Sequence, residues 1–78
     1  MFSELLDTHT IKVYDTNGVF ISSYFYKKDG VIWVKNVELG ECPHPRFGDN
    51  GADFDEWLID MIKNFKFSVD IKANEIKA

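Results

Sequence analysis

Hydrophobic and polar positions alternate along the first half of the chain, as they do in half-buried β-strands. Three runs carry this alternation: residues 10–14 (TIKVY), 19–27 (VFISSYFYK) and 31–39 (VIWVKNVEL). Short polar segments ending in Asn-Gly and Asp-Gly separate the runs, and these dipeptides favour tight hairpin turns because both residues tolerate a positive φ. The pattern therefore predicts an antiparallel meander of three strands.

A helical period replaces the alternation in the second half of the chain. Residues 40–51 (GECPHPRFGDNG) contain three glycines and two prolines, which predicts a loop. Beyond it, apolar side chains recur at spacings of three and four, as in an amphipathic helix: Phe54, Trp57, Leu58, Met61, Ile62 and Phe65. Asp53 is the expected N-cap, and Glu56 follows three residues later as in a capping box. We therefore expect a helix from about Asp53 to Phe65.

Alternation returns in residues 65–72 (FKFSVDIK), which predicts a fourth strand. With 78 residues the chain has the size of a single domain, 1–78. The expected fold class is α+β: an antiparallel sheet of about four strands, in the order β-β-β-α-β, with one amphipathic helix packed on one face. Two alternatives remain open for residues 1–9. Either Ser3 caps a helical turn that carries Leu5 and Leu6, or the segment is irregular.

The lengths of the turns determine which side chains share a face of the sheet. With two-residue turns at Asn17-Gly18 and Asp29-Gly30, Tyr14 lies opposite Ile21, and Phe25 lies opposite Val34. One face then carries Ile11, Val13, Phe20, Tyr24, Tyr26, Val31, Trp33, Val37 and Leu39, and we expect the helix there. The other face carries Lys12, Tyr14, Val19, Ile21, Ser23, Phe25, Lys27, Ile32, Val34, Asn36 and Glu38.

This second face is unusually apolar for one that faces water. Three explanations compete: the N-terminal segment folds back and covers it with Phe2, Leu5 and Leu6, two copies of the chain pair through it, or a different protein binds it. Exposed apolar patches with aromatic residues and a polar rim are typical of interaction sites. The predicted contact residues are Tyr14, Ile21, Phe25, Ile32 and Val34, with Lys12 and Glu38 at the rim.

Composition narrows the classes of partner. The chain has 13 acidic and 9 basic residues, and its longest basic run is Lys27-Lys28, which argues against direct nucleic-acid binding. The single cysteine, Cys42, excludes an internal disulfide. No signal peptide and no long apolar run is present, so we expect a soluble cytoplasmic protein without membrane contact.

The segment from Glu41 to Trp57 concentrates residues that often carry chemistry. Cys42 and His44 could bind a metal together with His9 and Asp49, but structural zinc sites usually combine paired Cys or His clusters, which are missing here. A Cys-His nucleophile pair lacks any suggested oxyanion hole. The glycine-rich stretch before the helix lacks lysine and is surrounded by acids that repel phosphate. We therefore expect no enzymatic activity, no catalytic residue, no metal and no cofactor.

Acidic residues accumulate along the predicted helix, with no Lys or Arg between Arg46 and Lys63: Asp49, Asp53, Asp55, Glu56 and Asp60. Acids in a first helical turn are favoured by the helix dipole, and acids opposite an apolar stripe form an ordinary solvated face. The functional alternative is an acidic patch, with Asp55, Glu56 and Asp60 as partner-binding residues, that contacts a basic protein surface.

Two stretches, IKVYDTNG at residues 11–18 and ADFDEWL at residues 52–58, resemble small phage-encoded anti-CRISPR proteins of the type I class. The resemblance implies a single domain that pairs an antiparallel sheet with helices and binds a crRNA-guided surveillance complex through its sheet. Tyr14 matches a contact tyrosine that directly precedes a turn. The loop at residues 41–50 has no counterpart, and Lys35 stands in the setting most similar to that of an acidic contact residue.

The leading functional hypothesis is a non-enzymatic inhibitor, an anti-CRISPR phage protein that evades host defence by binding a CRISPR-Cas surveillance complex or effector and blocking it sterically. One alternative is an immunity protein or antitoxin that neutralises a cognate toxin. A third is a structural or assembly subunit that associates with itself through the sheet. A phage or prophage neighbourhood favours the first hypothesis and a toxin gene nearby favours the second. A chain that is monomeric at micromolar concentration would exclude the third.

Overall fold

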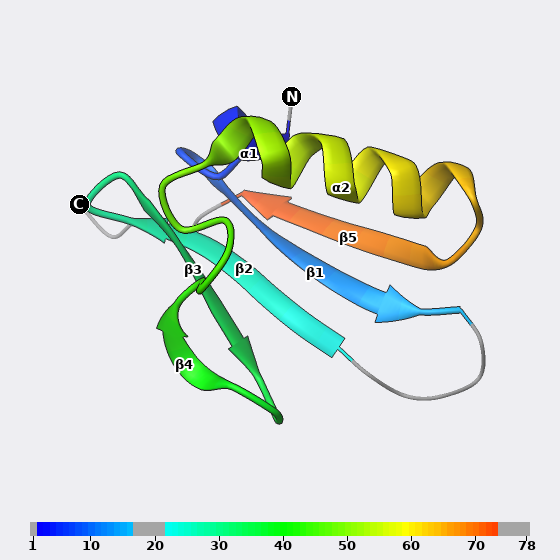
Figure 1. The fold of residues 1–78 in the computed structure, drawn as a ribbon, viewed down its shortest axis with the longest axis horizontal. Coiled ribbons are helices and arrows are strands. Elements are labelled where there is room, and N and C mark those ends of the chain that lie inside the picture. Colours follow the sequence, from blue (N-terminus) through cyan, green and yellow to red (C-terminus); the bar gives the residue numbers. More distant parts are fainter. Residues whose placement is uncertain (1, 17–21, 74–78) are drawn as a thin grey trace.

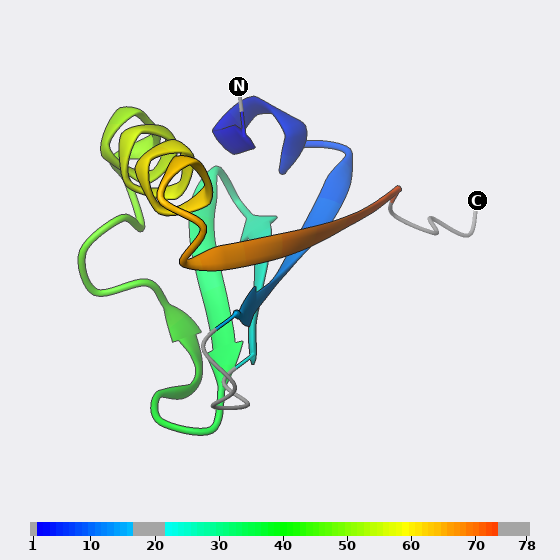
Figure 2. The same cartoon turned by 90° about the vertical axis from the view of Figure 1, so that its right-hand side faces the viewer.

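The computed structural model describes residues 2–16 and 22–73 as a five-stranded antiparallel sheet with two helices on the same side (Figures 1 and 2). The spatial order of the strands is β4-β3-β2-β1-β5. In chain order the elements are α1 (Phe2–Leu5), β1 (His9–Asp15), β2 (Ser22–Lys28), β3 (Val31–Asn36), β4 (Gly40–Pro43), α2 (Gly51–Lys63) and β5 (Phe67–Ala73). The predicted α+β class is confirmed, and the sheet has one strand more than we expected.

The additional strand is β4, which lies in the segment predicted to be a loop. It pairs antiparallel with β3, so that Val34 lies opposite Cys42 and Trp33 opposite Pro43. Pro43 has no N–H to donate, which is tolerated because β4 is at the edge of the sheet. The turn before β4 is closed by the Asn36 side chain, whose Oδ1 accepts the Leu39 N–H at 2.6 Å. The loop prediction, which was based on glycine and proline content, therefore missed a short edge strand.

The first hairpin has a different register from the predicted one. Tyr14 lies opposite Ser22, whereas the two-residue turn required Ile21 at that position. The predicted turn residues and Ile21 lie outside the described residues. A shift of one residue moves every side chain of one strand to the other face relative to its partner. As a result, Ile11 shares a face with Phe25, its direct partner, and not with Tyr24 and Tyr26 as we expected.

This shift decides which residues form the core. The second hairpin has the predicted register, with Phe25 opposite Val34, but the helices cover this face and not the one with Trp33. Phe25, Ile32 and Val34 are 2%, 2% and 1% exposed, so their assignment to a partner-binding patch is wrong. The buried cluster contains Leu6, Ile11, Val13, Phe25, Ile32, Val34, Phe47, Phe54 and Leu58.

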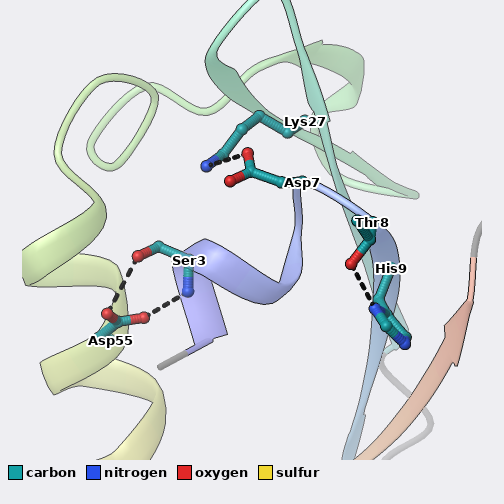
Figure 3. A network of polar contacts seen from close by, with 6 residues as sticks. All are labelled: Ser3, Asp7, Thr8, His9, Lys27 and Asp55. Carbon is teal, nitrogen blue, oxygen red and sulfur yellow. Dashed lines mark hydrogen bonds and ion pairs between the residues drawn. The ribbon is translucent and has the colours of Figure 1, made fainter.

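The N-terminal segment folds back on the same face as α2, beside which α1 lies in Figure 2. Leu6 is 1% exposed within the core, which confirms the fold-back alternative for this residue. The Asp55 carboxylate accepts hydrogen bonds from the Ser3 N–H at 2.6 Å and the Ser3 hydroxyl at 3.0 Å (Figure 3). Lys27 and Asp7 form an ion pair at 2.9 Å nearby. Gly51 permits this close approach, because a Cβ there would lie 2.9 Å from the Ser3 side chain.

Helix α2 begins two residues earlier than predicted, and its N-cap is Asn50 instead of Asp53. The Asn50 side-chain oxygen accepts the Asp53 N–H at 3.2 Å, and the Asp53 carboxylate accepts the Asn50 side-chain amide at 3.0 Å. Asp53 thus closes a reciprocal capping pair from the third helical position. After the helix, Phe65 has a left-handed backbone (φ 57°) and is 84% exposed. It therefore does not belong to the apolar stripe in which we placed it.

Candidate binding surface

On β1, β2 and β3, the phenylalanine lies on the helix side of the sheet, and the tyrosines and the tryptophan lie on the other side. Phe25 points into the core from β2, while its neighbours Tyr24 and Tyr26 point to the face that the helices leave uncovered. Tyr14 and Trp33 lie on the same uncovered face because they alternate with the buried Val13 and with Ile32 and Val34. Tyrosine and tryptophan combine a large apolar ring with a hydrogen-bonding group, so they tolerate water better than phenylalanine.

Three rings of the uncovered face, those of Tyr24, Tyr26 and Trp33, form a continuous layer. Tyr26 stacks on Trp33 with ring centroids 6.1 Å apart, and Tyr24 lies 5.8 Å from Tyr26. The Tyr26 hydroxyl donates a hydrogen bond of 2.6 Å to the Glu41 carboxylate on β4. Partial burial and this carboxylate raise the pKa of Tyr26 to about 12, so its hydroxyl remains a donor at neutral pH. The ring layer is thereby tied to the edge strand.

Lysines surround the rings. The Lys28 ammonium lies 4.9 Å from the centre of the Trp33 ring, and the Lys12 ammonium lies 5.5 Å from that of Tyr14. These distances are typical of cation–π interactions. One cross-strand row runs over all five strands in the order Asp70, Lys12, Tyr24, Lys35 and Glu41. The centre of the uncovered face is therefore basic and aromatic, and both edge strands contribute an acid.

The uncovered face is shallow. A depression of about 680 Å³ lies between the middle of the sheet and the β3–β4 turn. Its lining consists of Lys12, Tyr24, Lys35, Asn36, Val37, Gly40 and Glu41. Val37 in that turn is fully exposed, and Glu38 beside it is exposed. A broad open surface with aromatic and charged side chains suits contact with a macromolecule better than enclosure of a small substrate.

Only part of the predicted contact set lies on this surface. Lys12 and Tyr14 are on the uncovered face, and Glu38 is in the turn at its end. The predicted contact set lacked Tyr24, Tyr26, Trp33 and Lys35, because the predicted register of the first hairpin placed these rings in the core. The useful signal was chemical: Phe25, Ile32 and Val34 have no polar side-chain atom, whereas most of the alternating positions carry Tyr, Trp or Lys.

The acids of α2 are engaged within the protein to different degrees. Asp55 is half-buried and binds Ser3, as described above. The backbone and side-chain oxygens of Asp60 accept hydrogen bonds from the Asn64 side chain at 2.8 and 3.2 Å. Glu56 is exposed on the outer side of the helix. These contacts favour the interpretation of the acids as caps and solvated charges.

His44 stabilises the turn that leads into α2. Its Nδ1 accepts hydrogen bonds from the backbone N–H groups of Arg46 and Phe47, both at 3.1 Å, and its ring stacks on Phe47 at 4.8 Å. Cys42 is half-buried, and its thiol is 3.9 Å from the Leu39 carbonyl oxygen. Within residues 2–16 and 22–73 no group of three or more His, Cys, Asp or Glu side chains is placed to hold a metal ion.

The role of His44 predicts a pH-dependent stability. Burial and the nearby Arg46 charge lower the pKa of His44 below its ordinary value of 6.5. Its Nδ1 can accept the two backbone hydrogen bonds only while it is unprotonated. The unfolded chain therefore binds a proton at a higher pH than the folded one, and the stabilisation present above pH 6.5 is lost as the pH falls toward the folded pKa. Urea unfolding at about pH 7.5 and at about pH 5.5 measures this effect. We expect the free energy of unfolding to fall more between the two pH values for the wild type than for His44→Asn. Equal decreases would contradict this role.

Comparison with known proteins yields no relationship. No protein-family model matches the chain, and no curated protein sequence and no solved structure matches it significantly. None of the helices in the described part of the chain is long and apolar enough to cross a membrane.

Proposed function

We propose that the protein is a non-enzymatic inhibitor that binds another protein through its uncovered sheet face. The observation that carries this proposal is the layer formed by Tyr24, Tyr26 and Trp33, which lies opposite the core and adds nothing to the packing against the helices. Tyrosine and tryptophan are enriched among the residues that dominate binding energy at protein interfaces. Their placement on a hydrogen-bonded sheet also limits the entropy lost when they are immobilised by a partner.

Charge supports a protein partner over a nucleic acid. The chain has a formal net charge of −4, and the row through Lys12 and Lys35 ends in Asp70 and Glu41. A nucleic acid that followed this row would meet a carboxylate at each edge of the sheet. A protein surface with acidic groups near its centre and basic groups at its periphery is complementary to the same row. Such complementarity increases the rate of association and selects the partner.

The most specific form of the proposal is an anti-CRISPR protein that acts in the cytoplasm of the host cell. It is supported by the resemblance of residues 11–18, in which Tyr14 matches a contact tyrosine, and by the position of Tyr14 on the uncovered face. The mechanism is steric: a rigid sheet occupies a surface that nucleic acid or a nuclease subunit needs. No bond is made or broken, and no cofactor takes part.

Purified type I surveillance complexes test this function directly. Stoichiometric protein is expected to reduce binding of target DNA in a gel-shift assay, and Trp33→Ala is expected to weaken inhibition about 30-fold, as truncation of a dominant interface residue does. Phe65→Ala is the matched control, because Phe65 is exposed and aromatic but lies in the turn after α2. Circular dichroism verifies that both variants are folded. The proposal fails if no type I complex is inhibited, or if Trp33→Ala and Phe65→Ala inhibit as well as the wild type.

A further inference from the structure

The two edges of the sheet differ in their ability to accept another strand. At one edge, β4 has four residues and ends in Pro43, which cannot donate a backbone hydrogen bond. At the other edge, β5 has seven residues (Phe67–Ala73) without proline or glycine, and within the described residues only β1 pairs with it. Long regular edge strands are templates for further pairing unless charge, proline or a bulge prevents it. The charged side chains of β5 therefore decide whether this edge can pair with another strand.

The side chains of β5 are self-complementary in one register. When two β5 strands run antiparallel about a two-fold axis at Ile71, Asp70 of each copy lies opposite Lys72 of the other. The same register places Ile71 opposite its own equivalent. Ile71 is 37% exposed and lies on the helix side of the sheet, where its equivalent would cover it.

The neighbouring symmetric registers are electrostatically unfavourable. Centring the pair on Asp70 places two aspartates opposite each other, and centring it on Val69 places Lys72 opposite Lys66. Among these alternatives only the Ile71-centred register pairs unlike charges. A register centred on Ser68 also pairs unlike charges, but it pairs Asp70 with Lys66, which lies outside β5. Within β5 itself, the i, i+2 arrangement of Asp70 and Lys72 favours the Ile71-centred pairing and does not simply repel other strands.

We propose that two copies of the chain associate through β5 in the register centred on Ile71, which forms a continuous sheet of ten strands. This inference does not rest on the proposed function. The helix side of one copy continues into that of the other, so the two uncovered faces become one surface. The row that ends at Asp70 in one copy continues to Lys72 of the other. Few residues are paired, so the dimer is weak, with a Kd on the order of 100 µM.

Sedimentation equilibrium from low micromolar to about 1 mM protein measures this association. We expect Lys72→Asp to raise the Kd about tenfold, because two attractive cross-strand pairs become repulsive. Lys35→Asp changes another exposed lysine, on β3, and is the matched control, with an unchanged Kd. A wild type that is monomeric throughout this range would overturn the proposal, as would an equal effect of Lys72→Asp and Lys35→Asp.

A cross-link tests the register independently of charge. In a Cys42→Ser background, Ile71→Cys places two thiols opposite each other at the two-fold axis, at a Cβ separation of about 5 Å that a disulfide can bridge after slight adjustment. Mild oxidation is expected to convert most of this variant into a covalent dimer. Ser68→Cys in the same background is the control, because Ser68 does not face its own equivalent. Equal cross-linking of the two variants would overturn the proposed register.

Discussion

Replacing Phe25 with aspartate is expected to unfold the protein. The Phe25 ring is 2% exposed and lies 5.1 Å from the Phe54 ring and 6.1 Å from the Trp57 ring. A carboxylate at this position loses the packing of the ring and finds no partner for its charge, which costs about 5 kcal/mol or more. Small domains have a total stability of about 5–15 kcal/mol, and a chain of 78 residues lies near the lower end. Loss of the helical circular-dichroism signal measures the effect.

Tyr24→Asp is the matched control for this experiment. Tyr24 is the neighbour of Phe25 on β2, but its side chain lies on the uncovered face. A charge there remains in water, so the protein is expected to stay folded. If Phe25→Asp were folded and Tyr24→Asp were not, the assignment of the two faces would be reversed. The pair of variants therefore tests the feature that differs most from the sequence-based prediction.

Phe54→Ala is expected to lower the free energy of unfolding by about 3–5 kcal/mol, as large-to-small substitutions of buried phenylalanine do. Phe54 is fully buried on α2, between the rings of Phe25 and Phe47 at 5.1 and 6.0 Å. Its removal leaves a cavity among the Phe25, Phe47 and Trp57 rings on the helix side. Urea unfolding monitored by tryptophan fluorescence gives the change.

Trp57→Ala provides the comparison on the same helix. Trp57 contacts the Phe47 and Phe67 rings at 5.3 and 5.6 Å but is only half-buried, so we expect a loss of about 2–3 kcal/mol. Its unfolding is followed by circular dichroism, since the fluorophore is changed. A smaller loss for Phe54→Ala than for Trp57→Ala would contradict the described packing of α2.

The alternation of side chains was sufficient to locate most strands, because it depends only on the local geometry of the backbone. It predicted a strand at residues 65–72, which corresponds to β5, and the alternating Phe67 and Val69 are half-buried against the core. It did not detect β4, whose four residues pair with β3 only because the chain reverses at Asn36. The predicted capping pair, Asp53 and Glu56, lies three residues after the observed pair, Asn50 and Asp53. Both pairs have side chains suited to capping, so the sequence pattern did not distinguish them.

The candidate surface was harder to predict than the strands that carry it. The number of residues between Tyr14 and Ser22 determines which side chains of β1 and β2 lie on the same face of the sheet. A difference of one residue exchanges the faces of β1 relative to β2. The inferred contact residues Phe25, Ile32 and Val34 became the core for this reason. Lys12 and Tyr14 remained on the uncovered face because both belong to β1, whose own alternation was correctly described.

The amino-acid sequence by itself determined the class of the fold, the amphipathic character of α2 and the separation of pure hydrocarbon side chains from Tyr, Trp and Lys on alternate positions. These properties are local, since each depends on residues within a few positions of one another. Only the tertiary structure decided which side of the sheet the helices cover. That choice follows from the pairing of β1 with β2 and from the docking of Leu6 and Phe54 on the same face, and both join residues that are distant in the chain.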